Sequence, residues 1–371
     1  EILDKIIGIL GDFNFEEIDA DVIGRIYEIY LGTVLSVEEE VKGKKRTKLS
    51  ADYTERKKLG QYYTPKFVVD YIVKNTLGKL LDGKTPEEVS KIKVLDPACG
   101  SGSFLIRAFD YLKDYYVRYN DQQMSKVRKN GMGNMKTYVE NGEIVDYNHR
   151  ILKENLHGVD LNDLSTQICS INLWLRALEK DKKLEKLSKN ILHGNSLISG
   201  VEDKEELAKY KDELKEIAVL REKIKDFYGR ELKRKEQDEL NEMEENLRKL
   251  RQKVNAPLNE NLKEYFDNLD LVYPFNWEVE FTEVFDPDKK EEYQGFDVVI
   301  GNPPYVNVEK LDNEERNFFM QELSTSIKRF DIYIGFLEKG INLLREGGMI
   351  SYIIPYPFLT QNYAEKLRKE V

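Results

Sequence analysis

Short apolar runs alternate with stretches of helical spacing over most of this chain. The runs typical of buried strands lie at residues 91–95, 156–161, 191–193, 297–300 and 349–354. Between them, apolar residues recur every three or four positions, which predicts helices over residues 103–116, 164–178 and 333–344. Strands that alternate with helices predict a parallel sheet joined by crossover helices, and therefore an α/β fold.

The start of the chain departs from this pattern. Over residues 1–35 the apolar positions recur at helical spacing, so we expect a small helical domain there. The basic run over residues 41–58 shows little apolar periodicity and is typical of a linker or loop. We therefore divide the chain into residues 1–58, a helical domain with its linker, and residues 59–371, the α/β domain.

Residues 202–254 contain no strand pattern. Glu, Lys, Arg and Leu dominate this segment, and its helical spacing predicts a hairpin of two helices that turns near residues 228–230. We expect this hairpin, about residues 200–256, to be inserted into the α/β domain and to project into solvent. An arm that binds nucleic acid or a partner is the alternative that the charge pattern leaves open.

Composition restricts the class of protein. The 371 residues include 34% charged side chains and carry a net charge of -10, which argues against a surface coated all round for nucleic acid but leaves room for a local basic groove. No apolar stretch is long enough for a membrane span and no signal-peptide pattern opens the chain, so we expect a cytoplasmic protein. Two cysteines and three histidines predict neither a disulfide framework nor a structural metal.

A glycine-rich segment follows the first predicted strand and reads Asp-Pro-Ala-Cys-Gly-Ser-Gly-Ser-Phe over residues 96–104. Gly100 and Gly102 allow the backbone to approach a ligand, and the helix that follows offers free N–H groups. The dinucleotide fingerprint needs a third glycine and the P-loop needs a lysine after Gly102, so both are excluded. Asp96 beside this turn favours a cationic ligand, although a simple tight turn also explains the glycines.

Polar residues also follow the second and third strands. Asp160 can accept both hydroxyls of a ribose, and the alternative is that it caps the next helix. The segment Gly-Asn-Ser-Leu over residues 194–197 is suited to hydrogen bonds with an adenine edge, although by itself it is also a turn. These side chains and the glycine turn are expected at one edge of the sheet, where α/β proteins bind nucleotide-like ligands.

The most informative motif is Asn302-Pro303-Pro304-Tyr305, directly after the fourth predicted strand. Two prolines cannot belong to a central strand, so they stiffen a loop at its carboxyl end. The side-chain oxygen of Asn302 and the carbonyl of Pro303 can accept both hydrogens of an exocyclic amine and localise its lone pair. The ring of Tyr305 offers a face on which a base can stack.

Together with Gly-Gln-Tyr-Tyr-Thr-Pro at residues 60–65, these motifs resemble the ordered motifs of N6-adenine DNA methyltransferases of the gamma arrangement. They look most like the methylase portion of Type IIG restriction-modification enzymes. The resemblance implies a Rossmann-like mixed sheet flanked by helices, S-adenosylmethionine as cofactor and double-stranded DNA as substrate. It also implies a downstream target-recognition domain and an upstream nuclease domain in the complete protein, neither of which we recognise in these residues.

The resemblance also assigns residues. Those expected at the cofactor are Tyr63, Thr64, Pro65, Asp96, Pro97, Ala98, Gly100, Gly102 and Phe104, with Asp160 and Leu161 at the ribose and Asn195 and Ser196 at the adenine. Asn302, Pro303, Pro304 and Tyr305 are expected to hold a flipped adenine for in-line methyl transfer, without a metal or a covalent intermediate. A second aromatic residue for the base is not identifiable.

Three alternatives remain open. The motif at residues 302–305 also occurs in methyltransferases that act on a glutamine of release factors. The same chemistry would serve N4 of cytosine, although those enzymes more often carry Ser before Pro-Pro-Tyr. The chain could also be a non-catalytic subunit that binds S-adenosylmethionine within a DNA-binding complex.

Overall fold

The computed structural model describes residues 33–41, 44–51, 64–129, 147–177, 190–201, 204–225, 227, 232–286, 288–323 and 330–369. Within them, a five-stranded sheet has the order β5-β4-β3-β6-β7. The bounds of its strands are Val94–Asp96 (β3), Leu156–Asp160 (β4), Ile191–His193 (β5), Phe296–Gly301 (β6) and Leu344–Tyr352 (β7). All neighbouring pairs in this sheet run parallel, which confirms the predicted α/β fold.

Alternate residues of the central strands point to opposite faces of the sheet, as the twofold period of a strand requires. Val94, Val298 and Ile300 pack into one core with helices α4 (Lys66–Asn75), α7 (Ser103–Lys129) and α10 (Asp163–Ala177). Leu95 and Val299 face the other way and pack with aromatic residues of the segment before β6. The sheet is therefore buried on both faces, which explains its continuous apolar runs.

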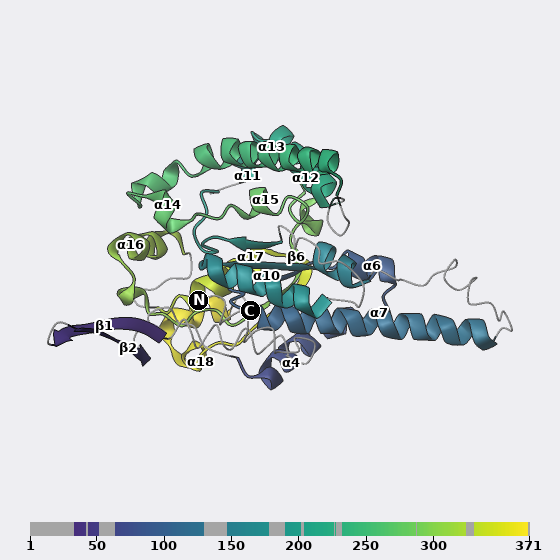
Figure 1. Cartoon of the computed structure of the whole chain (residues 1–371), viewed down its shortest axis with the longest axis horizontal. Coiled ribbons are helices and arrows are strands. Elements are labelled where there is room, and N and C mark those ends of the chain that lie inside the picture. The colour runs from purple at the N-terminus through teal and green to yellow at the C-terminus, as the bar shows by residue number, and fades with distance from the viewer. Residues whose placement is uncertain are drawn as a thin grey trace.

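The remaining helices connect or cover these layers. They are α5 (Leu77–Leu80), α6 (Pro86–Ser90), α9 (Tyr147–Arg150), η1 (Ile151–Asn155), α11 (Lys204–Ala208), α12 (Lys211–Lys225), α13 (Arg234–Leu258), η2 (Asn261–Glu264), α14 (Leu269–Val272), α15 (Trp277–Glu280), η3 (Glu291–Tyr293), η4 (Val308–Lys310), α16 (Asn313–Glu322), α17 (Tyr333–Asn342), α18 (Pro357–Thr360), η5 (Asn362–Ala364) and α19 (Glu365–Arg368). Figure 1 shows α4 and α7 on one side of the sheet, and α15 and then α13 on the other. In the described part of the chain, no helix is long and apolar enough to cross a membrane.

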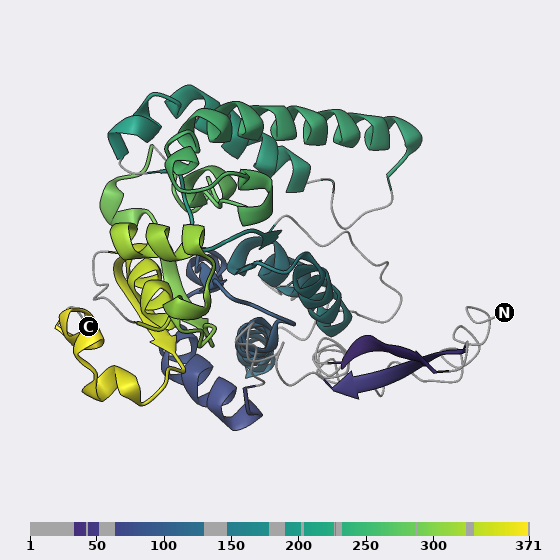
Figure 2. The ribbon, with the colours of Figure 1, turned by 90° about the vertical axis from the view of Figure 1, so that its left-hand side faces the viewer.

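The hairpin of α12 and α13 forms an additional layer rather than the solvated projection that we expected. Its apolar residues form a cluster of their own, which also takes in Val279 of α15. Figure 2 shows the helices of the hairpin along the top of the ribbon. Arg221 of α12 is only 2% exposed and donates to both carboxylate oxygens of Glu283, at 2.9 and 2.8 Å. Leu, Ile and Val every three or four residues predicted the helices, whereas the contacts of this buried ion pair span 62 positions and have no local signal.

A buried asparagine fixes the base of this hairpin. The side-chain oxygen of Asn276 accepts from the Ser199 hydroxyl at 3.0 Å and from the Gly200 N–H at 2.8 Å. Its amide nitrogen donates to the side chains of Asn255 at 3.0 Å and Asn259 at 2.9 Å. Both ends of the inserted segment are therefore tied to one point beside the sheet.

Several local expectations were wrong. The segment over residues 41–58, expected as a linker or loop, contributes to a hairpin in which β1 (Thr33–Val41) pairs antiparallel with β2 (Lys44–Ala51). Four of the nine residues of β1 are β-branched, a type that favours strands. Helix α7 extends to Lys129, past the expected residue 116. The expected helices of residues 1–32 lie outside the described residues.

Candidate active site

The predicted motifs meet at the carboxyl edge of the sheet because all of its strands run in the same direction. Strand β3 ends at Asp96, β4 at Asp160 and β6 at Gly301, immediately before Asn302. Asp96 lies in register with Gly158, and Asp160 with His193. Loops that are separated by up to 200 residues in the sequence therefore converge on one place.

The two glycines of the first loop have different tasks. Both have positive φ angles, 52° at Gly100 and 94° at Gly102, a region that other residues rarely adopt. A Cβ atom on Gly102 would lie 2.7 Å from the sulfur of Cys169, so this glycine allows α7 to pack closely against α10. A Cβ atom on Gly100 would meet no atom within 4 Å, so this position borders open space at the sheet edge.

Asp96 is buried at the end of β3. Its Oδ1 accepts the N–H of Ala98 at 3.1 Å, and a Cβ atom on Gly301 would lie 2.7 Å from the same oxygen. Burial raises the pKa of this carboxyl group to about 8, and the neighbouring Asp160 contributes in the same direction. A carboxylate in this position is stabilised by a cation that approaches it.

Asp160 joins the second strand to the glycine loop. Its Oδ2 accepts the N–H of Gly100 at 2.9 Å and its Oδ1 accepts the N–H of Asn162 at 2.8 Å. Burial raises its pKa, while these two hydrogen bonds act in the opposite direction. A carboxylate offers about four lone-pair positions, so two acceptor positions remain for further donors. The helix-capping role goes instead to Asn162, whose side-chain oxygen accepts the N–H of Ser165 at 3.2 Å.

The third loop is locked to the other two. Asn195 accepts the N–H of Leu197 on its side-chain oxygen at 3.1 Å, and the hydroxyl of Ser196 donates to the carbonyl of Pro97 at 2.6 Å. Leu161 is half exposed next to Asp160. Phe104, by contrast, is 3% exposed and packs in the core between α7 and the sheet, and its place near the cofactor stays a prediction.

The loop after β6 is held on two sides. The side-chain nitrogen of Asn302 donates to the Thr64 hydroxyl at 3.0 Å. The hydroxyl of Tyr305 lies within hydrogen-bond distance of two acceptors, the side-chain oxygen of Asn302 and, at 2.8 Å, the carbonyl of Ile353. Burial raises the pKa of Tyr305 to about 12, so the hydroxyl keeps its single proton at neutral pH and donates it to one acceptor at a time.

Comparison with known proteins identifies the family. The model of the Eco57I restriction-modification methylase family matches residues 154–370, which is more than half of the chain and includes Asp160, Asn195 and the loop at Asn302. The chain belongs to the Eco57I restriction-modification methylase family. The model of the N-6 DNA methylases matches residues 48–213, which include Thr64 and the glycine loop.

Curated relatives of this methylase are much longer than the chain itself. It is 26% identical to the type II restriction enzyme and methyltransferase RM.Eco57I of Escherichia coli, over 96% of the chain but 29% of the relative. It is 24% identical to the putative type II enzyme RM.MjaORFECS2P of Methanocaldococcus jannaschii, over the whole chain and 37% of the relative. The chain thus spans about a third of these relatives.

Solved structures give weaker similarity. The Type ISP restriction-modification enzyme LlaBIII bound to DNA superimposes with a TM-score of 0.44 at 19% identity, over 85% of this chain and 16% of the other. The DrdV–DNA complex gives 0.42 at 17% identity, over 86% and 23%.

Three residues near the site of this methylase were not predicted. Gly301 leaves the space that the Asp96 carboxylate fills, and Ile353 supplies a carbonyl to Tyr305. Tyr273 has a left-handed backbone with φ of 54°, its carbonyl accepts the N–H of Asn195 at 2.8 Å, and its ring lies 4.4 Å from that of His193. Tyr273 gives no sequence signal, because it reaches the third loop only through tertiary pairing. Tyr63, the remaining predicted cofactor residue, lies outside the described residues.

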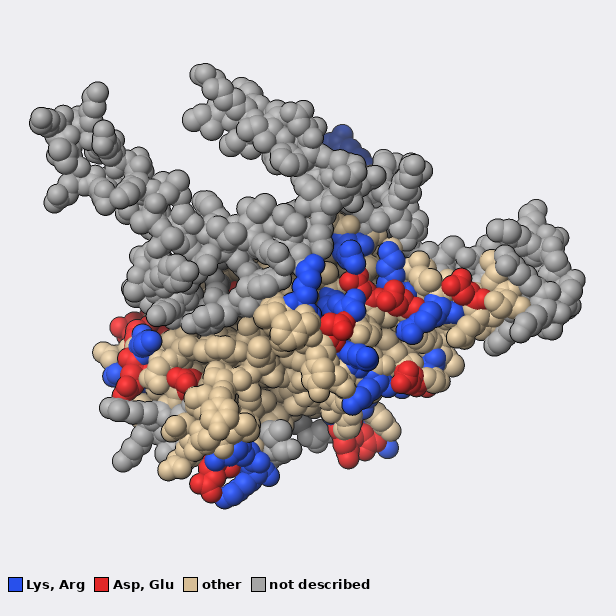
Figure 3. All heavy atoms as spheres, turned by 90° about the horizontal axis from the view of Figure 1, so that it is seen from below, with Lys and Arg blue, Asp and Glu red and all other residues tan. Residues whose placement is uncertain are grey.

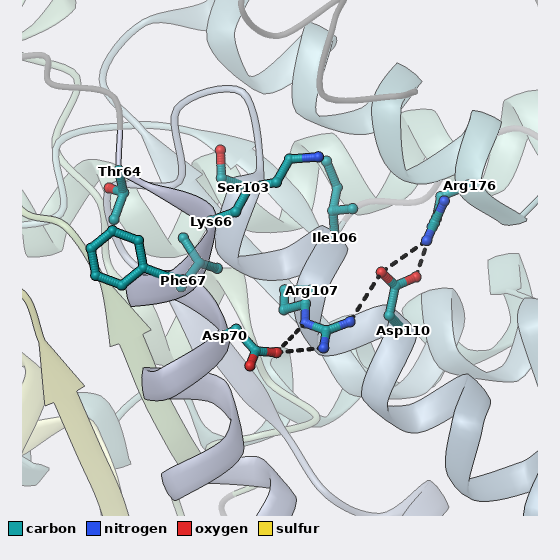
Figure 4. Close-up of a pocket in the computed structure, with 10 residues that line it drawn as sticks. Thr64, Lys66, Phe67, Asp70, Ser103, Ile106, Arg107, Asp110 and Arg176 are labelled. Atoms are coloured by element: carbon teal, nitrogen blue, oxygen red, sulfur yellow. Dashed lines mark hydrogen bonds and ion pairs between the residues drawn. The ribbon is translucent and has the colours of Figure 1, made fainter. Parts of the chain in front are cut away.

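A cavity of about 360 Å³ lies beside Thr64, between α4, α7 and α10. Figure 4 shows three ion pairs along its lower side, which join Asp70 to Arg107, Arg107 to Asp110 and Asp110 to Arg176. Ser103, at the first turn of α7, and Lys66 line its upper side. Because Thr64 borders this cavity and also bonds Asn302, the cavity opens next to the loop of residues 302–305.

Proposed function

We propose that this chain is the methylase portion of a restriction-modification enzyme and transfers the methyl group of S-adenosylmethionine to N6 of an adenine flipped out of DNA. The observation that carries this proposal is the placement of the Asn302 amide, fixed by Thr64 at the sheet edge that also bears Asp96 and Asp160. The amide oxygen of Asn302 suits the neutral amine that receives the methyl group. The two carboxylates beside it suit the cationic methyl donor. Membership of the Eco57I methylase family supports the same reaction class.

The residues at this edge fit the cofactor. Gly100 borders open space, and Asp160 keeps acceptor positions for the two hydroxyls of a ribose. We assign Asp96, Pro97, Ala98, Thr64 and Pro65 to the methionine end and Asn195 with Ser196 to the adenine end. When bound there, S-adenosylmethionine supplies an electrophilic methyl group on a sulfonium, and the Asp96 carboxylate offers this cation a partner.

Asn302 is oriented for its task by its own neighbours. Its Nδ2 is committed to Thr64, so its Oδ1 is the atom left to accept a hydrogen from the exocyclic amine. The Tyr305 hydroxyl lies within hydrogen-bond distance of Asn302 Oδ1, but it can donate to the carbonyl of Ile353 instead. We infer that, when the base enters, the Tyr305 hydroxyl donates to Ile353 in place of Oδ1 at little cost, because one acceptor replaces another.

Catalysis in this proposal consists of positioning. Pro303 and Pro304 stiffen the loop, and the Pro303 carbonyl accepts the second amine hydrogen, which localises the lone pair of the nitrogen. With S-adenosylmethionine bound, these two acceptors would hold the amine nitrogen toward the methyl group that the sulfonium supplies, and the proton that the nitrogen loses would pass to solvent. We expect the parts that read the DNA sequence to belong to other regions of the complete protein, which would explain how a segment with a net charge of -10 serves a DNA enzyme.

The test uses the complete gene product, methyl-labelled S-adenosylmethionine and unmethylated plasmid DNA, followed by digestion to nucleosides. We expect label in N6-methyladenine, and none with Asn302→Ala, whose cofactor affinity should stay within a few-fold of the parent. Label in N4-methylcytosine would mean that the substrate base is cytosine and not adenine. Label on a protein glutamine, or cofactor binding without any transfer, would replace this proposal by the protein-substrate or non-catalytic alternative.

A further inference from the structure

The loop of residues 302–305 is hydrogen-bonded to two separate segments, and each of these segments carries exposed aromatic side chains. Thr64, which bonds Asn302, directly precedes α4, where Phe67 is 76% and Tyr71 is 68% exposed. Ile353, which bonds Tyr305, precedes α18, and Tyr356 at the N-cap of that helix is 73% exposed. Aromatic residues thus stand on both sides of the proposed base site.

Helix α4 presents a basic and aromatic face. Phe67 and Tyr71 are four residues apart and therefore lie one above the other on the helix, with Lys66 and Lys74 exposed beside them. The helix contains one acid, Asp70, which accepts from the Nε of Arg107 at 2.8 Å. In Figure 4 the Phe67 ring lies close to Thr64, on the side away from the ion pairs of the cavity.

The opposite side of the loop is uncharged. Tyr356 and Leu359, which is 63% exposed, flank Phe358, whose side chain is buried in the core next to α17. This anchor and the bonds from Arg368 to the carbonyls of Phe358 and Gln361 fix α18. The exposed side chains of α18 are therefore held in place by the fold and do not belong to a free end.

Figure 3 views the face on which α4 and α18 lie. An uncharged surface extends across part of it, bordered by Lys and Arg side chains with Asp and Glu among them. Exposed apolar surface of this kind usually marks an interaction site. Rings next to lysines suit a nucleic acid in particular, because bases stack on aromatic faces while ammonium groups neutralise phosphates.

We propose that Phe67, Tyr71 and Tyr356 form an aromatic rim that grips the DNA around the extruded adenine. Flipping one nucleotide breaks its stacking on both neighbours, and the exposed rings compensate by packing against the bases and sugars that flank the gap. The bonds through Thr64 and Ile353 couple this rim to Asn302 and Tyr305. The inference rests on the proposed function, because it needs DNA at this edge of the sheet.

The test measures DNA affinity, cofactor affinity and thermal stability of the complete protein. Binding of a labelled duplex that contains the methylated site, found by sequencing modified plasmid, is followed by fluorescence anisotropy. We expect Phe67→Ala and Tyr356→Ala each to weaken binding roughly tenfold, as loss of one base–aromatic contact does. Affinity for S-adenosylmethionine should stay within twofold, and Phe67→Tyr and Tyr356→Phe should retain DNA affinity.

Tyr293→Ala is the matched control. Tyr293 is 61% exposed, but it precedes β6 and so lies at the amino edge of the sheet, opposite the loop of residues 302–305. Unchanged DNA affinity in the rim variants with a lower melting temperature would show that another part of the polypeptide covers this face, and would overturn the inference. Unchanged affinity and unchanged melting would also overturn it. If the parent protein methylates no DNA, the proposed function itself is wrong. If the parent methylates DNA and the rim variants bind DNA as well as the parent does, only this inference is wrong.

Discussion

The side chains of Asn302 and Thr64 are hydrogen-bonded at 3.0 Å although 238 positions separate them in the sequence. The bond joins the segment that precedes α4 to the loop that follows β6. It fixes the orientation of the Asn302 amide, because an amide that donates on one side must present its oxygen on the other. The chemistry proposed for Asn302 therefore depends on a residue that does not belong to its own motif.

Thr64→Val tests this orientation. Valine keeps the shape of threonine but removes the hydroxyl, so the Asn302 amide loses its acceptor and can rotate. A neutral hydrogen bond contributes about 1 kcal/mol, so we expect kcat to fall roughly fivefold to tenfold in the methyl-transfer assay. Thr64→Ser, which keeps the hydroxyl, should retain most of the rate. A loss of cofactor affinity as large as the loss of kcat/KM would instead mean that Thr64 acts on the cofactor alone.

Gly301→Ala tests the fit between β6 and Asp96. The new methyl group would lie 2.7 Å from the carboxylate oxygen, so the carboxylate or the strand must move. We expect a loss of stability of about 1–3 kcal/mol, as for other overpacked interiors, together with weaker cofactor binding. Gly78→Ala is the control, because its nearest neighbour is the movable ring of Tyr111 at 3.3 Å. Equal melting temperatures for both variants would contradict this prediction.

The pH dependence of cofactor affinity follows from Asp96. With a pKa of about 8, its carboxyl group is mostly protonated at neutral pH in the ligand-free protein. A sulfonium favours the carboxylate, so binding releases a proton and affinity should rise with pH and level off only above pH 8. S-adenosylhomocysteine, whose sulfur is neutral, should show a smaller rise when both are measured by calorimetry. Identical pH profiles for the two ligands would exclude a contact between Asp96 and the sulfonium.

Asp96 also affects stability. Its pKa is raised from 3.8 in the unfolded chain to about 8, so its contribution is most favourable below pH 4 and is lost as pH rises toward 8. Asp96→Asn removes the buried charge but keeps an oxygen for the Ala98 N–H. We expect this variant to melt above the parent at pH 8, and the difference to shrink toward pH 4. A difference that is independent of pH would contradict the assignment.

Arg221→Met tests how firmly the hairpin of α12 and α13 is attached. The change leaves Glu283 buried without its guanidinium, so we expect a loss of about 3–5 kcal/mol in the free energy of unfolding. The double variant with Glu283→Gln should recover part of this loss, because it removes the uncompensated charge. Lys253→Met, which breaks an exposed ion pair with Glu213, is the control and should cost less than about 1 kcal/mol. A small effect of Arg221→Met would mean that the hairpin is only loosely attached, as the sequence-based expectation of a projection into solvent has it.

The sequence by itself determined the strands, the helices between them and the loops that carry the motifs. Apolar periods of two and of three to four residues are local properties, and glycines and prolines restrict the backbone wherever they stand. For this reason the region around Asp96, Asp160 and Asn302 could be predicted as one site once the strands were taken to be parallel. The basic run before residue 58 was misread, because a two-stranded hairpin leaves only a weak local pattern.

Only the tertiary structure decided which atoms meet. It made Asn162 the helix cap, left Asp160 with open acceptor positions, and placed Phe104 in the core. It also brought Tyr273, Thr64 and Ile353 to the site. It buried Arg221 of α12 in an ion pair with Glu283. The physical reason is the same in each case. Hydrogen bonds and ion pairs form between residues tens to hundreds of positions apart, and their geometry depends on how whole layers pack, which no local pattern records.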